Sequence, residues 1–125
     1  MQKDTRRMTV ARDHLEVARK ELANAGLQTD VHVQRGALHR ALNHLELARS
    51  RLLEQREFVR GATDSALHEA FDAVAAASAC VAGLLDRWPA HPTAAIVEAR
   101  DRTAAAIDAI DRACAIGAHE QRLHP

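Results

Sequence analysis

The pattern that decides the fold lies in residues 8–25, which read MTVARDHLEVARKELANA. Apolar residues recur in this stretch at alternating spacings of three and four, which places them on one face of an amphipathic helix. These residues are Met8, Ala11, Leu15, Ala18, Leu22 and Ala25. The positions between them are mostly charged or polar, so the opposite face is expected to contact water. The stretch predicts a helix over about residues 4–25.

Three more stretches carry the same kind of pattern. Their apolar seams are Leu38, Leu45, Leu52 and Val59, then Leu67, Val74, Val81 and Trp88, and finally Ile96, Ala99, Thr103, Ile107, Ile110, Cys114 and Gly117. They predict helices over about 30–60, 63–88 and 92–120. Because short turns join the four helices, each must pack against the next in antiparallel orientation. We therefore expect an all-α protein, an up-down-up-down four-helix bundle that forms a single domain over residues 1–125.

The helix boundaries are predicted from capping residues. Gly26 suits the left-handed position after a helix, and Leu27 can fold back onto Leu22 in a Schellman motif. Thr29 or Asp30 can accept the free N–H groups of the second helix. The other expected boundaries are a stop at Gly61, a cap at Thr63-Asp64, the Pro89–Pro92 break and a cap at His91 or Thr93.

Composition and charge argue against several classes of protein. Lys plus Arg and Asp plus Glu number 17 each, so net charge gives no global attraction to nucleic acid or to an anionic membrane. Residues 1–60 are mildly basic and residues 61–125 mildly acidic. The charged residues 1–8 lead into no apolar segment, and the longest nearly uncharged run, 73–85, is shorter than the roughly 20 residues of a membrane span. We expect no signal peptide, no membrane contact and a cytoplasmic location, and the excess of Arg over Lys favours a bacterial or phage origin.

The first two predicted helices contain an internal repeat. Residues 11–22, ARDHLEVARKEL, match residues 41–52, ALNHLELARSRL, at seven of twelve positions. A solenoid needs at least three such units. We therefore interpret the repeat as two helices that pack against the core in the same way.

Eight histidines make metal binding a question for this chain. Metal-binding helices usually carry His-x3-His or Glu-x2-His pairs, and neither pattern occurs. We expect no bound metal, and the candidate ligands are the two repeat histidines, His14 and His44. In an antiparallel hairpin these two lie at similar heights beside the core seam. Their imidazoles could meet and, in a dimer, four could converge on Zn or Ni. The alternative is that they are boundary residues that pack their rings.

Nucleophilic chemistry has no strong candidate in this sequence. Two cysteines do not make a disulfide framework. Cys80 and Cys114 fall on or near apolar faces, where a thiol is an inert small hydrophobe. We expect both thiols to be free and unreactive.

Residues 112–119, RACAIGAH, are similar to the Arg-x4–6-His motif of the HEPN family of helical ribonucleases. In that family the Arg and the His serve the cleavage of RNA at a dimer cleft. The resemblance implies that Arg112 and His119 would be the catalytic pair of an HEPN-like ribonuclease. It covers eight residues, and Ala113 stands where the family usually keeps a polar residue.

Arginines line one flank of the first two predicted helices. This basic flank consists of Arg12, Arg19, Arg35, Arg49 and Arg56. Rows of arginine can follow a phosphate backbone. Alternatively, these side chains pair with acids of their own or neighbouring helices. The chain has no Tyr and only three Phe and Trp residues, which argues against a base-stacking platform.

The sequence contains no strong catalytic motif, and its first half is mildly basic where its second half is mildly acidic. These two features favour a non-catalytic bundle without a cofactor. We expect it to act through its surface as a subunit or adaptor of a larger protein assembly, with another protein or a second copy as partner. The first alternative is a nucleic-acid-backbone-binding small helical subunit of a ribonucleoprotein, for example a CRISPR effector complex. The second is the HEPN-like ribonuclease.

Overall fold

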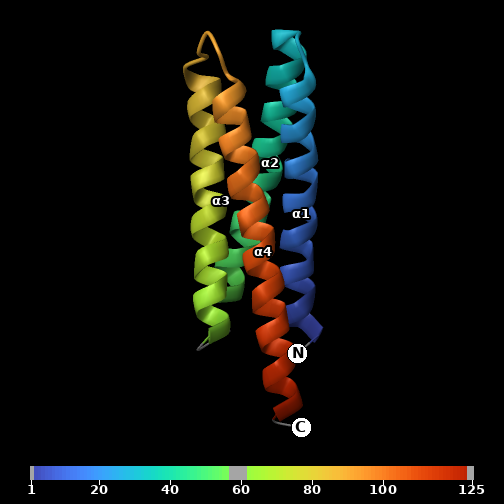
Figure 1. Ribbon diagram of the computed structural model, residues 1–125. Coiled ribbons are helices and arrows are strands. Elements are labelled where there is room, and N and C mark those ends of the chain that lie inside the picture. Colours follow the sequence, from blue (N-terminus) through green and yellow to red (C-terminus); the bar gives the residue numbers. More distant parts are fainter. Residues whose placement is uncertain (1, 57–61, 124–125) are drawn as a thin grey trace.

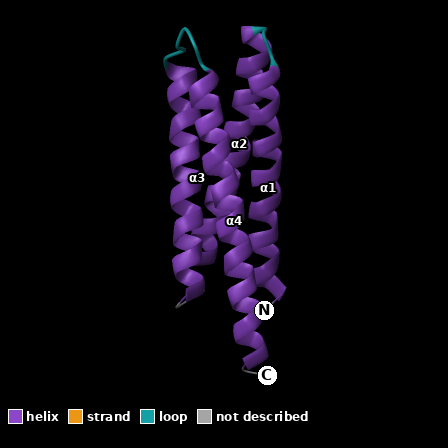
Figure 2. Cartoon of the chain, viewed as in Figure 1, coloured by secondary structure: helices purple, strands orange, loops and turns teal. Residues whose placement is uncertain are grey.

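The computed structural model describes residues 2–56 and 62–123, and these form four α-helices. Their bounds are α1 Gln2–Leu27, α2 Val31–Arg56, α3 Ala62–Asp86 and α4 Thr93–Leu123. The helices run alternately up and down as an antiparallel four-helix bundle (Figure 1). The α1–α2 and α3–α4 turns lie at one end of the bundle, as the teal loops in Figure 2 show. The predicted all-α bundle is confirmed.

Each helix contacts two neighbours. α1 packs against α2 and α4, and α3 packs against α2 and α4. The most extensive contacts lie within the two hairpins, α1–α2 and α3–α4. At the end opposite the turns, α4 projects beyond the other three helices (Figure 1).

The core follows the predicted seams closely. In α1 and α2 its apolar residues are Met8, Ala11, Leu15, Ala18, Leu22, Ala25, Ala37, Leu38, Ala41, Leu45, Ala48 and Leu52. In α3 the buried residues beside Leu67, Val74 and Val81 are mainly Ala66, Ala70 and Ala77, whereas Phe71 and Leu85 are only half-buried. Small alanine side chains thus make up much of the buried face of α3.

The start of α2 is capped as predicted. The Asp30 carboxylate accepts hydrogen bonds from the backbone N–H groups of His32, at 2.8 Å, and Val33, at 3.3 Å. These bonds satisfy two of the donors that open a helix and have no partner within it.

The end of α1 differs from the prediction. The helix continues through Gly26 to Leu27, and Leu27 is 82% exposed, so the predicted Schellman contact is wrong. The reason lies in the next helix. The Gln34 side-chain amide donates to the carbonyl of Ala25 at 2.9 Å and to the carbonyl of Gln28 at 3.4 Å. A side chain from α2 thus takes the role that a left-handed glycine would otherwise have.

The boundaries of α3 and α4 also shift. α3 begins at Ala62, and the Thr63 hydroxyl is buried without a hydrogen-bond partner in the described part of the chain, so it is not the predicted cap. α3 ends at Asp86, two residues before the predicted end, and Trp88 lies beyond it. α4 starts after Pro92, whose carbonyl accepts the N–H of Ile96 at 3.1 Å. The predicted end of the second helix at about residue 60, with Val59 and Gly61, lies outside the described residues.

One described helix is long and apolar enough to cross a membrane by length and composition alone, namely Thr63–Asp86 of α3. An alanine-rich core helix of a soluble bundle has the same composition. α3 buries Leu67, Val74 and Val81 in the bundle, so the finding is compatible with a soluble protein.

Candidate functional site

The arginines of the basic flank on α1 are bound to carboxylates of the same chain. Arg12 donates to the Asp111 carboxylate of α4 at 2.8 Å and also lies 3.5 Å from Glu16. The hydrogen bond with Asp111 raises the pKa of Arg12 further above its ordinary value. Arg19 binds the same Glu16 at 2.6 Å. A phosphate would therefore have to compete with carboxylates already in place.

The arginines of the flank on α2 also have intramolecular partners. Arg35 donates to the backbone carbonyl of Leu85 at 3.2 Å, and its guanidinium lies 5.2 Å from the centre of the Trp88 ring. It thereby caps the C-terminal end of α3. Arg49 lies 3.6 Å from Glu46 and 5.6 Å from the centre of the Phe71 ring. The side chain of Arg56 lies outside the described residues.

The two residues of the ribonuclease-like motif lie on α4. Arg112 binds Glu69 of α3 at 2.6 Å, and both side chains are exposed. His119 is exposed as well, near the end of α4 that projects from the bundle (Figure 1). The two positions are seven apart in the sequence, which separates them by roughly 10 Å along the helix axis. Within one chain, the guanidinium is therefore engaged by a carboxylate rather than by the imidazole.

The two cysteines are free thiols, and both residues are half-buried. The Cys80 thiol donates to the carbonyl of Ala95 at 3.2 Å, and the Cys114 sulfur lies 4.0 Å from that of Met8. Burial raises the pKa of both thiols, and the nearby carboxylates of Glu98 and Asp111 add to the effect. Neither environment favours a reactive thiolate.

The repeat histidines are brought together between α1 and α2. The Nδ1 atoms of His14 and His44 lie 3.0 Å apart, so that one ring can donate its proton to the other. The ring centres are 5.2 Å apart and the ring planes are tilted by 35°. Both side chains are half-buried. The antiparallel register of the hairpin produces this contact, since Leu15 and Leu45 each enter the core one residue further along.

The environment of His14 disfavours a positive charge on its ring. Burial lowers the pKa of His14, and the neighbouring His44 and Arg51 lower it further, while Asp13 acts weakly in the opposite direction. Neutral imidazoles are the form that binds transition metals. The lowered pKa of His14 thus favours the neutral form of that ring.

Two exposed aliphatic residues lie next to the histidines, one turn further along each helix. They are Val17, 39% exposed, and Leu47, 47% exposed. We refer to His14, Val17, His44 and Leu47 together as the histidine face. The aliphatic members were not predicted from the sequence, although the repeat places Val17 and Leu47 at equivalent positions. Exposed aliphatic side chains next to a histidine pair make this face a candidate surface for contact with a partner.

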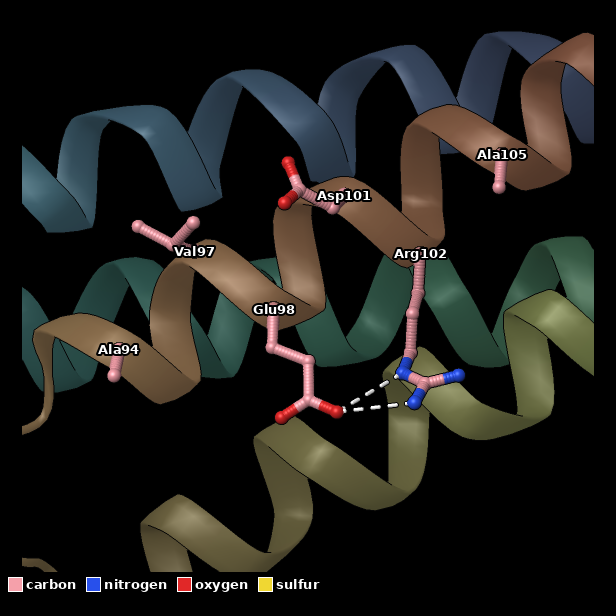
Figure 3. Close-up of a pocket in the computed structure, with 6 residues that line it drawn as sticks. All are labelled: Ala94, Val97, Glu98, Asp101, Arg102 and Ala105. Carbon is pink, nitrogen blue, oxygen red and sulfur yellow. Dashed lines mark hydrogen bonds and ion pairs between the residues drawn. The ribbon is translucent and has the colours of Figure 1, made fainter.

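A shallow depression lies on the outer surface of α4 (Figure 3). Its lining residues are Ala94, Val97, Glu98, Asp101, Arg102 and Ala105. Glu98 and Arg102 form an ion pair at 3.0 Å on one side of the helix. All six residues belong to α4, so this hollow lies along one helix and not in a cleft between elements. It does not enclose a small molecule in the way substrate sites do.

Within residues 2–56 and 62–123, no group of three or more His, Cys, Asp or Glu side chains is arranged to hold a metal ion. The histidine pair therefore supplies two ligands from one chain. No protein-family model, no curated protein and no solved structure matches this chain. The functional argument therefore rests on the geometry of the chain itself.

Proposed function

We propose that the chain is a non-catalytic helical bundle that acts through its surface as a subunit or adaptor of a larger protein assembly. The observation that carries this proposal is the histidine face, where Val17 and Leu47 expose aliphatic side chains beside two half-buried imidazoles. Burial of such a surface against a partner protein removes apolar area from water. The proposed partner is another protein or a second copy of this chain, in a reducing cytoplasm where the two thiols stay free.

The ion pairs of the basic flank support a protein partner over a nucleic acid. Arg12 and Arg19 share Glu16, and Arg12 also binds Asp111. A phosphate contact at Arg12 or Arg19 would have to replace a carboxylate contact, which reduces the gain from counterion release. Zero formal net charge adds no long-range attraction to a polyanion.

A direct experiment tests whether the chain binds nucleic acid. Retention on heparin and binding of a generic single-stranded RNA are measured across a salt series, for the wild type and for the double variant Arg19→Glu with Arg49→Glu. We expect weak binding by both proteins with little dependence on salt. Micromolar binding by the wild type that the double variant loses, with a salt slope flatter by about one log unit per lost contact, would establish the ribonucleoprotein alternative.

The complementary experiment tests the histidine face with Leu47→Glu. Tagged wild-type and variant proteins are purified from cells of the source organism, together with a differently tagged second copy, and the co-purified proteins are quantified. We expect the variant to lose its partner at least tenfold, since it places a charge in a buried contact. Leu53→Glu is the matched control, because Leu53 is also exposed on α2 but lies outside the histidine face. Equal recovery of partner by all three proteins contradicts the proposal.

A further inference from the structure

The internal repeat gives the α1–α2 hairpin an approximate two-fold symmetry. Equivalent positions lie 30 residues apart. Glu16 and Arg19 form an ion pair at 2.6 Å, and their counterparts Glu46 and Arg49 form one at 3.6 Å. The core residues of the two repeats correspond in the same way, namely Ala11 with Ala41, Leu15 with Leu45, Ala18 with Ala48 and Leu22 with Leu52, and all are fully buried.

The histidine contact has the symmetry of the repeat. His14 and His44 are equivalent residues, and they meet through the same atom, Nδ1 to Nδ1. A two-fold axis that exchanges α1 with α2 must therefore pass between these two nitrogens. Val17 and Leu47, which are also equivalent, lie around that axis on the outer surface.

The separation of the two rings suits a shared metal ion. Two nitrogens that each lie about 2.0–2.1 Å from a tetrahedral zinc ion are roughly 3.3 Å apart, with ring centres about 5 Å apart. The observed values are 3.0 Å between the Nδ1 atoms and 5.2 Å between the ring centres. The two separations are thus close to those of a zinc-bound histidine pair.

We propose that His14 and His44 are one half of a zinc-type metal site, and that the same pair from a second copy of this chain completes it. Structural zinc is bound by four ligands in a tetrahedron, and one chain offers two in its described part. An ion on the approximate two-fold axis leaves its two free positions pointing outward, away from the bundle. A second histidine pair, turned by about 90°, fills both positions.

The surroundings of the pair favour a second copy over solvent ligands. Val17 and Leu47 expose aliphatic surface that a second histidine face would cover with its own copies of these residues. Such an isologous contact uses the same patch twice, as two-fold dimers do. The charges around the pair have partners of their own: Glu21 binds Arg40 at 3.1 Å, and Arg51, whose charge acts on His14, lies 3.4 Å from Glu54. The contact therefore buries few unpaired basic side chains.

This inference rests on the proposed function, since it names the partner as a second copy and the bond as a metal ion. The test uses the full chain with zinc chloride alone as the probe. Titration calorimetry gives the stoichiometry, and sedimentation equilibrium gives the mass with zinc and with a chelator. We expect one zinc per two chains and a zinc-dependent doubling of the 13.7 kDa mass. Cobalt(II) in place of zinc should give the strong visible absorption of tetrahedral coordination.

His44→Gln is expected to lose both zinc binding and zinc-dependent dimerisation, while its helical circular dichroism is unchanged. His39→Gln is the matched control, since His39 is an exposed histidine on the same helix, and it should behave as the wild type. Zinc bound by the monomer, zinc-dependent dimers of His44→Gln, or no zinc binding at all would each overturn the inference. If zinc does not bind but Leu47→Glu still loses its partner, the metal site is wrong and the proposed function stands.

Discussion

Two buried glutamines on α2 allow a matched test of the packing. Gln34 is 7% exposed and Gln55 is 0% exposed. The side-chain amide of Gln34 donates to the carbonyls of Ala25 and Gln28. Neither polar atom of the Gln55 amide has a hydrogen-bond partner in the described part of the chain. A buried amide without a partner destabilises a protein by about 1–3 kcal/mol.

We therefore expect opposite effects from the same substitution. Gln55→Met should raise the free energy of unfolding by about 1–3 kcal/mol, because methionine fills a similar volume and has no amide to desolvate. Gln34→Met should lower it by a similar amount, about 1–3 kcal/mol, because the carbonyl of Gln28 loses this donor and that of Ala25 keeps only the N–H of Gln28, at 3.3 Å. In a domain of this size 1 kcal/mol corresponds to about 4 °C in Tm, so the two variants should differ by roughly 8–24 °C.

The assay is thermal and urea denaturation, followed by far-ultraviolet circular dichroism at a fixed protein concentration and with a chelator present. The midpoint should shift without a change in the urea slope, which would show that stability has changed and not compactness. Equal destabilisation by the two variants would refute the reasoning. It would mean that the Gln55 amide contributes as much to the fold as the Gln34 amide does.

Three further outcomes are expected. Leu45→Ala should lower the free energy of unfolding by about 2–5 kcal/mol, because Leu45 is fully buried. Leu53→Ala, at an exposed position of the same helix, should change it by less than about 1 kcal/mol. Similar Tm shifts for the two variants would show that the assigned buried face of α2 is wrong. The pKa of His14 is lowered in the folded state, so the stability that this residue contributes should be complete above the ordinary histidine pKa of 6.5 and be lost as pH drops through the folded pKa. In a series of Tm measurements against pH, recorded with a chelator, His14→Gln should make this decline less steep. The pKa of Cys80 is raised in the folded state, so the stability that the thiol contributes should be lost as pH rises through the folded pKa. A thiol reagent should label Cys80 slowly until denaturant is added, and fast labelling of the native protein would contradict its half-buried position.

The sequence by itself determined the helices and their buried faces. Spacings of three and four place Leu15 and Leu22 on one face wherever the helix lies, because this periodicity is a property of a single helix. The Asp30 cap is likewise a local interaction, between a side chain and the N–H groups two and three residues ahead. The antiparallel order follows from short connections alone.

Only the tertiary structure decided which polar groups meet. Arg12 binds Asp111, 99 residues away, and Gln34 replaces the expected glycine motif at the end of α1. The repeat indicated that His14 and His44 lie at similar heights, but the contact through their Nδ1 atoms required the structure. Such contacts depend on the rotation and axial offset of one helix against another. These two variables are set by the packing of the whole core, to which every buried residue contributes, so no local pattern encodes them.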